Sequence, residues 1–466
     1  MRALPTGSGH DHHDPAQHRG LSTPNFEVVG WSPLPTAAME NKSAGGWACG
    51  ETSVTSSGRH LAVVNSFTTD VMFVLVDITD PAHPQKVGEF VMPEGHAYDV
   101  AMTPDGAHVL LAQNNVRQGQ ITGALQQPYF RDACTGAHVP TDPNGLLSVL
   151  PGVVLINVAD PTHPKIVDGF FSGAVGPQSV ATSQVDGVTY AIVSALQIEH
   201  QASFYEFFTV EGDKLDLQSV YQAPPVPGQT PAILNGHMDG TIAKHPLTHQ
   251  TLAYLADWNA GMIVVDVSNI RVPLYVSSFS EMKDPTVYIP ADGSIHDVWP
   301  INGTWEGRHY VLAGQELTDK PADRPSGWVY ILDDTDPANL KVAGRWTIPV
   351  EREWQGYLAF SLHYVGMVDR TLFVSSYHAG LWAVNLSTPE QIANPPTLGV
   401  FIPDRAPPDP PPAKDQTGTP DVEDVLPQPD GTLVTFDAYS GAYVLRFHPE
   451  TSGVPALPAW TLTHKP

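Results

Sequence analysis

Four histidines occupy nearly the same place in a pattern that recurs along this chain of 466 residues. Each stands just before or within the start of a short apolar strand: His96 in GHAYDV, His237 in GHMDG, His296 in SIHDV and His363 in SLHYV. Neutral imidazole is the commonest metal ligand in proteins, and it suits iron, copper and zinc. If these strands converge on one axis, the four side chains can hold one transition metal ion there.

The spacing of these histidines decides which of them can point the same way. His96, His296 and His363 each lie an even number of residues before the next inward apolar residue. Strand side chains alternate between two faces, so these three can share a face. His237 lies an odd number of residues before Gly240, and we expect that it needs a bulge or a loop position to join them.

Carboxylates and tyrosines accompany the histidines in the repeat. A metal-bound imidazole usually donates its second ring nitrogen to a carboxylate or a carbonyl group. The carboxylates suited to that role are Glu51, Asp239, Asp297, Glu316, Glu423 and Asp424. Tyr98 and Tyr364 could act as general acids or substrate contacts, with a structural role as the alternative. We predict Tyr98, Glu51, Asp239 and Glu423 as the catalytic residues.

The elements that must position these residues are repeated units of short strands. A strand ending in Asp or Asn, followed by a turn and often by Asp-Pro, recurs at residues 73–81, 153–161, 263–270, 329–337 and 381–389. Asp-Pro suits a turn because Asp accepts backbone N–H bonds and Pro presets φ. One short strand follows each copy and two precede it, so each unit has four strands.

Seven such units predict an all-β fold, a seven-bladed β-propeller with four-stranded blades and long loops on one face. The predicted blades are residues 47–93, 94–173, 174–225, 235–281, 294–349, 360–403 and 421–448. Residues 25–31 (NFEVVGW) resemble an outer strand, so we expect them to complete the last blade and close the ring. Residues 459–464 (AWTLTH) are the alternative closing strand.

Five insertions interrupt the repeat, at residues 114–150, 222–235, 281–293, 316–327 and 404–420. Three of them join an outer strand to the next inner strand, so we expect them to wall a pocket over the channel mouth. Residues 1–24 are predicted to be a flexible, histidine-rich tail, and residues 25–466 a single propeller. We expect His378, in a turn between the second and third strands of the sixth blade, to lie on the opposite face in a structural role.

Two families share features with these repeats. FVLVDITDP, VVLINVADP and IVVDVSNI resemble the LVIVD-repeat propeller family. TLAYLADWNAGMIVVDV and DRTLFVSSYHAGLWAVNL are distantly similar to the blades of the selenium-binding protein, or methanethiol oxidase, family. The resemblance covers most of the chain at the level of the repeat and implies mainly the fold. The second family is a metal-linked oxidase with a reactive cysteine in a cysteine-rich motif, whereas Cys49 stands alone in GWACGETS.

Composition excludes several classes of function. Asp and Glu total 49 against 23 Lys and Arg, and the net charge of −26 argues against nucleic-acid binding, which needs clustered basic residues. No apolar run reaches the roughly 18 residues of a membrane helix. The first residues lack the apolar segment of a signal peptide. We therefore expect a cytoplasmic protein, or a secreted one if a signal was removed. Cys49 and Cys134 leave one disulfide possible.

Together these observations predict a metal-dependent enzyme that acts on a small organic substrate. The metal, which could be iron, copper or zinc, would be held by His237, His296 and His363, with His96 as fourth ligand. We expect oxidation or oxygenation first, and metal-assisted hydrolysis or lyase chemistry as the alternative, because the ligands do not distinguish them. The rival hypothesis is a non-catalytic propeller that binds protein or carbohydrate through its loops and holds no metal.

Overall fold

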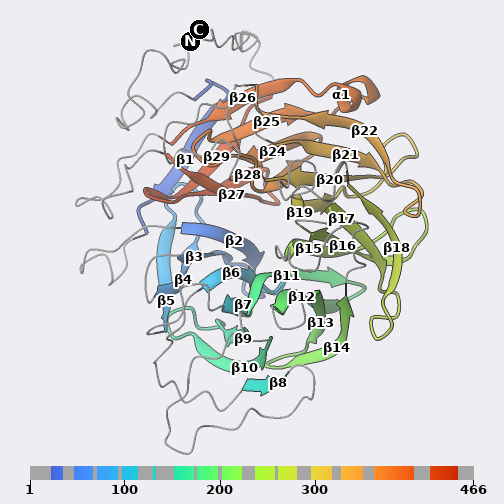
Figure 1. Ribbon diagram of the computed structural model, residues 1–466. Coiled ribbons are helices and arrows are strands. Elements are labelled where there is room, and N and C mark those ends of the chain that lie inside the picture. The colour runs from blue at the N-terminus through green and yellow to red at the C-terminus, as the bar shows by residue number, and fades with distance from the viewer. Residues whose placement is uncertain are drawn as a thin grey trace, which may run out of the picture.

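The chain folds into a ring of seven four-stranded antiparallel sheets, as the repeats predict (Figure 1). The computed structural model describes residues 22–34, 47–66, 71–92, 97–113, 130–132, 152–172, 176–197, 202–222, 237–257, 261–280, 295–316, 327–349, 361–403 and 420–449. The tail up to residue 21 and nearly all of the five predicted insertions lie outside these residues.

Each of the first four blades runs outward from its inner strand in chain order, and the blade limits match the predicted ones. Blade 1 comprises β2 (Trp47–Val54), β3 (His60–Ser66), β4 (Val71–Asp77) and β5 (Gln85–Val91). Blade 2 comprises β6 (Ala97–Met102), β7 (His108–Gln113), β9 (Gly152–Asn157) and β10 (Lys165–Phe171), with β8 (Phe130–Asp132) added parallel to β10. Blade 3 comprises β11 (Pro177–Val185), β12 (Val188–Gln197), β13 (Ala202–Val210) and β14 (Leu215–Gln222). Blade 4 comprises β15 (His237–Lys244), β16 (Thr251–Asp257), β17 (Gly261–Asp266) and β18 (Leu274–Phe279).

The remaining three blades include the one that closes the ring. Blade 5 comprises β19 (Ile295–Pro300), β20 (Tyr310–Gln315), β21 (Val329–Asp333) and β22 (Lys341–Trp346). Blade 6 comprises β23 (Val365–Val368), β24 (Thr371–Ser375), β25 (Leu381–Asn385) and β26 (Thr397–Phe401), with the short helix α1 (Pro389–Ala393) before β26. Blade 7 comprises β27 (Val422–Pro427), β28 (Thr432–Asp437), β29 (Gly441–Phe447) and β1 (Phe26–Ser32).

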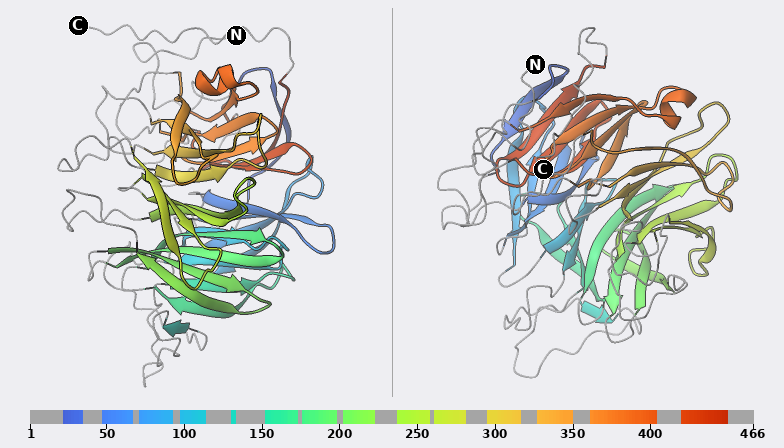
Figure 2. Two further views of the ribbon diagram at one scale, coloured as in Figure 1. Left: turned by 90° about the vertical axis from the view of Figure 1, so that its right-hand side faces the viewer. Right: turned by 45° about the horizontal axis from the view of Figure 1, so that its top comes forward.

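Strand β1 closes the ring, which confirms the prediction for residues 25–31. It pairs antiparallel with β29, and Figure 2 shows it in blue beside the red strands of blade 7. The ring of Phe26 packs against that of Phe447, with centroids 4.9 Å apart. Just before β1, the Thr23 amide donates to the Val400 carbonyl of β26 at 2.8 Å. The two ends of the propeller are therefore joined by backbone pairing and by aromatic packing.

The hydrophobic core lies between the blades, because each central strand is apolar on both faces. In β24, Leu372 and Val374 belong to the core between blades 5 and 6, whereas Phe373 belongs to the core between blades 6 and 7. Burying both faces favours the β-branched and aromatic residues that fill these strands. Each blade therefore packs against both of its neighbours, and this packing holds the inner strands around a central channel.

Small residues in the outer strands set how closely neighbouring blades approach. A Cβ atom added at Gly88 of β5 would lie 1.8 Å from the Pro161 carbonyl oxygen, in the Asp-Pro turn of blade 2. Gly30 of β1 faces the Pro81 carbonyl oxygen of blade 1 in the same way, at 2.1 Å. Each of these two outer strands has a register shift beside its glycine, and the shift brings the strand backbone against the Asp-Pro turn of the neighbouring blade. The Asp-Pro turns therefore serve as contact points between blades.

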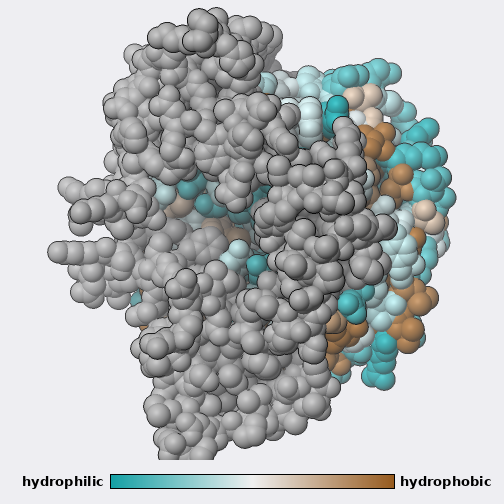
Figure 3. All heavy atoms as spheres, in the orientation of Figure 1, coloured by the Kyte–Doolittle hydropathy of each residue, from teal (hydrophilic) through white to brown (hydrophobic). Residues whose placement is uncertain are grey.

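The outer rim carries the exposed apolar side chains. In blade 4, Val272, Leu274 and Tyr275 are each more than half exposed, and Figure 3 shows apolar side chains on the side of the molecule that carries β18. Within the described ranges, no helix is long and apolar enough to cross a membrane.

Candidate metal and acid–base site

Two of the four predicted histidines meet at the inner edge of blades 5 and 6. His296 lies in β19, and His363 lies two residues before β23; their ring centroids are 4.3 Å apart and both side chains are buried. Glu316, the residue after β20, joins them: its Oε2 lies 3.6 Å from His296 Nε2. One ligand atom from each of the three residues lies within 4.8 Å of the other two.

The distance between His296 Nε2 and Glu316 Oε2 indicates which kind of contact the two atoms can make. At 3.6 Å the two atoms are too far apart for a hydrogen bond. Two ligand atoms that each lie about 2.1 Å from a shared metal are roughly 3 to 4.2 Å apart. The observed distance therefore fits a pair of ligands better than a hydrogen-bonded pair.

His363 is held in one tautomer by the backbone of blade 7. Its Nδ1 lies 2.6 Å from the Glu423 carbonyl oxygen, which also accepts a bond from Ser375 Oγ at 3.0 Å. Because a carbonyl oxygen only accepts, Nδ1 must carry the hydrogen. The lone pair of the neutral ring is then on Nε2, which is the arrangement that metal-bound histidines use.

Burial keeps both imidazoles neutral. It lowers the pKa of His363 to about 4, although the bond to the Glu423 backbone acts in the opposite direction. The pKa of His296 is lowered well below its usual value, first by burial and then by the nearby His363, although a bond to the His363 backbone acts in the opposite direction. At neutral pH both rings therefore present lone pairs, so a metal ion would not have to displace protons from them.

Tyr377 orients the carboxylate of the group. Its hydroxyl donates to Glu316 Oε1, and its ring lies 4.6 Å from that of His363. Burial, together with the negative charges of Glu316 and Glu423, raises the pKa of Tyr377 well above its usual value. The phenol thus keeps its proton and fixes one oxygen of Glu316 while the other faces His296. From its place in the sequence, Glu316 was predicted only as a supporting carboxylate.

The other predicted residues divide into three groups. Glu423 lies beside the histidines, with its Oε2 3.4 Å from His363 Nδ1. Tyr98 is mostly buried in β6, where burial and the charge of Glu316 raise its pKa to about 12. His96 and the side chain of His237 lie outside the described residues. Strand β15 does have a register shift directly after His237, at the place where we expected a bulge.

The prediction for His378 is wrong. In an antiparallel blade the turn between the second and third strands lies on the face where the inner strand begins, which we call the histidine face. Tyr377, the residue before His378, forms two backbone hydrogen bonds of 2.9 Å with Val422, the first residue of β27. The Nδ1 atom of His378 lies 3.7 Å from Asp421 Oδ1. His378 therefore belongs to the same neighbourhood as His363, on the histidine face and not opposite it.

Carboxylates of the inner strands connect neighbouring blades. Three inner strands have a register shift just before an aspartate whose Oδ2 accepts a backbone N–H of the next blade. The links are Asp99 to Val180 at 2.9 Å, Asp297 to Val365 at 2.6 Å, and Asp424 to Gly50 at 2.8 Å. Asp297 and Asp424, two of the predicted supporting carboxylates, therefore bind backbone amides rather than imidazoles, and Asp99 does the same.

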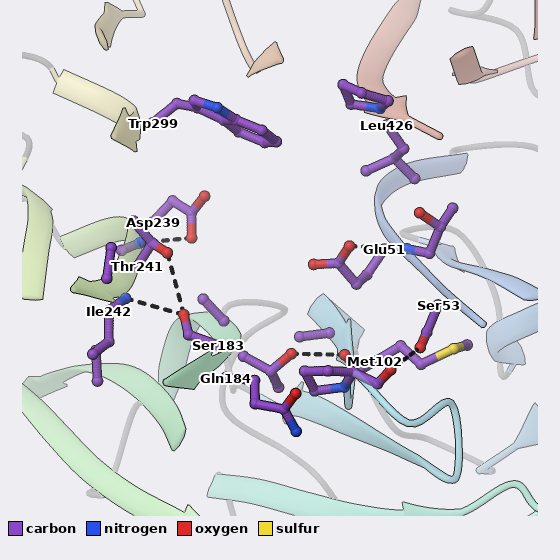
Figure 4. A pocket seen from close by; sticks show the side chains of 18 of the residues that line it. Glu51, Ser53, Met102, Ser183, Gln184, Asp239, Thr241, Ile242, Trp299 and Leu426 are labelled. Carbon is purple, nitrogen blue, oxygen red and sulfur yellow. Dashed lines mark hydrogen bonds between the residues drawn. The ribbon is translucent and has the colours of Figure 1, made fainter. Parts of the chain in front are cut away.

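The same carboxylates face a channel of about 820 Å³ along the inner strands. Glu51 and Asp239 extend into it from opposite sides, with hydroxyls of Ser183 and Thr241 on its wall (Figure 4). Burial raises the pKa of Glu51 to about 7 and that of Asp239 well above its usual value, the latter with help from Asp297. Two of the four residues predicted as catalytic thus lie in the channel, away from the contacts of His296 and His363.

Tyr364 lies between the channel and the histidines. It lines the channel, and its ring centroid is 4.6 Å from that of His363 and 5.0 Å from that of His296. Its hydroxyl donates to Cys49 Sγ at 3.4 Å. Cys49 is a free, buried thiol, and burial together with Asp99 raises its pKa. A thiol kept protonated in this way is a poor nucleophile.

A second buried group contains residue types that can bind metals, but its side chains contact other protein atoms instead. It consists of His245, His309 and Asp334, between blades 4 and 5. His245 Nε2 contacts the Asp334 carbonyl oxygen at 2.9 Å, and its Nδ1 accepts from the Thr248 amide at 3.0 Å. His309 Nε2 contacts the Ile301 carbonyl oxygen at 2.8 Å, and its Nδ1 lies 2.7 Å from Asp334 Oδ1. Three of the four ring nitrogens form hydrogen bonds with protein atoms, and the fourth, His309 Nδ1, lies beside Asp334 Oδ1 without one, so this group connects blades.

Comparison with known proteins agrees with the repeat and the fold. The family model of the LVIVD repeat matches residues 252–280, which span β16 to β18. The chain is a β-propeller that contains an LVIVD repeat. Among solved structures, this propeller is similar to a protein from Lactobacillus plantarum, with 11% identity, a TM-score of 0.51, and coverage of 81% of this chain and 88% of that one. Sqt1 of Saccharomyces cerevisiae also matches, with 10% identity, a TM-score of 0.49, and coverage of 88% and 98%.

At these identities the structural likeness concerns the fold alone. No curated protein matches this chain. The distant similarity to the selenium-binding protein family stays a prediction. Function must therefore be argued from the side chains of the site.

Proposed function

We propose that this propeller is a metal-dependent oxidoreductase for a small organic substrate, with the metal held by His296, His363 and Glu316. The proposal rests on one observation: ligand atoms of these three buried residues lie within 4.8 Å of one another. Two histidines and one carboxylate with open positions are the typical ligands of non-haem iron(II) in oxygenases. Iron is therefore our first choice of metal, and copper or zinc remain alternatives.

The surroundings support this set of ligands. Burial keeps the two imidazoles neutral, the Glu423 carbonyl fixes the tautomer of His363, and Tyr377 fixes Glu316. A bound iron would supply redox chemistry and open positions for oxygen and substrate. The protein would contribute rigid ligand positions and the exclusion of water. His96 and His237 stay candidates for a further ligand.

The metal content of the full-length, untagged protein tests the proposal. We expect close to one transition metal ion per chain after growth with iron, and its loss in His296→Ala, His363→Ala and Glu316→Ala. His108→Ala is the control, because His108 is a buried histidine of blade 2 whose Nε2 contacts Asp213. Circular dichroism should show that all four variants are folded.

Three outcomes would contradict the proposal. Protein that carries no metal and takes up none from iron, copper, zinc or manganese solutions would favour the non-catalytic propeller. Full metal content in the three ligand variants would mean that the metal binds elsewhere, for instance in the histidine-rich residues 1–24. Tight binding of zinc with no binding of iron would favour hydrolysis over oxidation.

A further inference from the structure

We propose that the channel binds a small neutral sugar, with the sugar ring held between Trp299 and the polar side chains of Glu51 and Thr241. The inference goes beyond the proposed function, because none of these three residues is a ligand of the proposed metal. It starts from the channel itself, whose volume of about 820 Å³ lies within the range of small-molecule pockets. The three side chains come from blades 5, 1 and 4 and lie around the same space (Figure 4).

The channel-facing residues of the inner strands form two layers. The first layer contains Asp99, Asp239, Asp297 and Asp424. Side chains two residues apart along a strand point to the same side, so the residues two positions farther on form a second layer. Together with the matching positions of blades 1 and 3, the second layer lines the channel with Glu51, Ala101, Ala181, Thr241, Trp299 and Leu426.

The first layer is occupied by contacts within the protein. Asp99, Asp297 and Asp424 each accept a backbone N–H of the next blade. Asp239 accepts the Gly240 amide at 2.6 Å, and its carboxyl group also shares a hydrogen bond with Asp297. A ligand in the channel must therefore be recognised by the second layer.

The apolar part of the second layer leaves room for a flat ring. Trp299 belongs to blade 5, and in a ring of seven blades the opposite wall is formed by blades 1 and 2. The side chain that blade 2 contributes there is Ala101, and blade 3 contributes Ala181, so small residues lie across from the indole. One face of a pyranose consists of C–H groups, and this face can pack on an indole ring by dispersion.

The polar part of the second layer can both donate and accept hydrogen bonds. Ser183 Oγ lies 3.2 Å from Thr241 Oγ1 and accepts the Ile242 amide at 3.0 Å. The two hydroxyls share one hydrogen bond, so one of their two hydrogens is left to donate to a ligand. Glu51 Oε1 accepts the Thr52 amide at 2.9 Å, which leaves the second carboxyl oxygen for a ligand. Sugar hydroxyls donate and accept, and so they match both walls.

The charges of the lining select a neutral ligand. Among the described lining residues the basic side chain is Lys244, and its ammonium group is already bound to Asp186 at 2.5 Å, so an anion would meet only carboxyl groups. Burial raises the pKa of Glu51 to about 7, and that of Asp239 well above its usual value. These carboxyl groups therefore keep protons near neutral pH, and a cation would bind well only after they had been lost.

Saturation-transfer NMR with the methyl pyranosides of glucose, galactose, mannose and xylose tests the inference on the full-length protein. Calorimetry then measures the affinity of the sugar that binds best, with tetramethylammonium as a cation that can also pack on an indole. We expect at least one sugar to bind with submillimolar affinity, and more tightly than tetramethylammonium. Trp299→Ala should reduce the affinity for this sugar at least tenfold, and Thr241→Val should reduce it severalfold.

Matched variants separate hydrogen bonding from charge and from general effects on the fold. Glu51→Gln keeps a neutral group that donates and accepts, so the affinity should stay within a few-fold of that of the unaltered protein, whereas Glu51→Ala should lose more. The control is Thr209→Val in β13, because the hydroxyl of Thr209 contacts Gln218 on the outer part of blade 3, and its affinity should be unchanged.

Three results would overturn the inference. The first is that none of the four sugars binds at millimolar concentration. The second is unchanged affinity in both Trp299→Ala and Thr241→Val, which would place the sugar elsewhere; if Trp299→Ala does not fold, Thr241→Val decides alone. The third is tetramethylammonium binding that is tighter than that of every sugar and is lost in Glu51→Gln, which would make the channel a cation site.

Discussion

Replacing Asp99 with asparagine should change how the stability of the propeller depends on pH. The carboxyl group of Asp99 is 5% exposed, and burial raises its pKa from 3.8 to about 7, against the effect of bonds from the Val100 and Val180 amides. Between these values the folded protein keeps a proton that the unfolded chain has released. The stabilisation that comes from the proton on Asp99 is therefore fully present below about pH 4, and it is lost as the pH rises through 7.

The size of this effect follows from the two pKa values. A difference of about 3 pH units corresponds to about 4 kcal/mol, since each unit is worth about 1.4 kcal/mol. An asparagine side chain cannot ionise, so this part of the pH dependence should disappear in the variant. Its amide can offer an oxygen to only one of the two backbone N–H groups, so at pH 5.5 we expect a loss of about 1–3 kcal/mol relative to the unaltered protein.

Urea denaturation followed by tryptophan fluorescence at pH 5.5 and pH 8.5 measures the difference. At pH 8.5 the variant should be as stable as the unaltered protein or more stable. The control is Asp77→Asn, because Thr79 and Arg59 lower the pKa of Asp77, so its contribution is constant above its ordinary value of 3.8 and is lost as the pH falls through the lowered value. Its difference from the unaltered protein should be the same at both pH values. Parallel curves for Asp99→Asn would refute the reasoning.

Two further substitutions test the contacts between blades and the support of the metal site. Gly88→Ala should destabilise the propeller by at least about 1–3 kcal/mol in thermal or urea denaturation, because its Cβ would lie 1.8 Å from the Pro161 carbonyl oxygen. Gly314→Ala, whose Cβ would come no closer than 3.4 Å to its neighbours, should cost less, and equal losses would argue against the contact. Tyr377→Phe removes the hydroxyl that donates to Glu316, so metal affinity should fall about 10–100-fold in competition with a chelator while the fold is kept. Unchanged affinity would show that Glu316 is not a ligand or needs no support.

Repetition is what the sequence determined most fully. Strands that end in Asp or Asn before a turn, often Asp-Pro, recur along the chain. This repetition predicts four-stranded blades, the limits of each blade and the number of blades. It also predicts β1 as the closing strand, because residues 25–31 match the other outer strands. His296 and His363 were found in the same way, since equivalent positions in neighbouring blades lie close together on the inner edge.

Only the tertiary structure decided which side chains from different blades touch. Glu316 follows the second strand of blade 5 and has no counterpart in the repeat, yet it faces His296. Asp297 and Asp424 were predicted as partners for imidazoles, but register shifts turn their carboxylates toward the backbone of the next blade. His378 was expected on the wrong face. For the aspartates the physical reason is that a repeat fixes positions within a blade, whereas contacts across blades depend on bulges and on the closure of the ring.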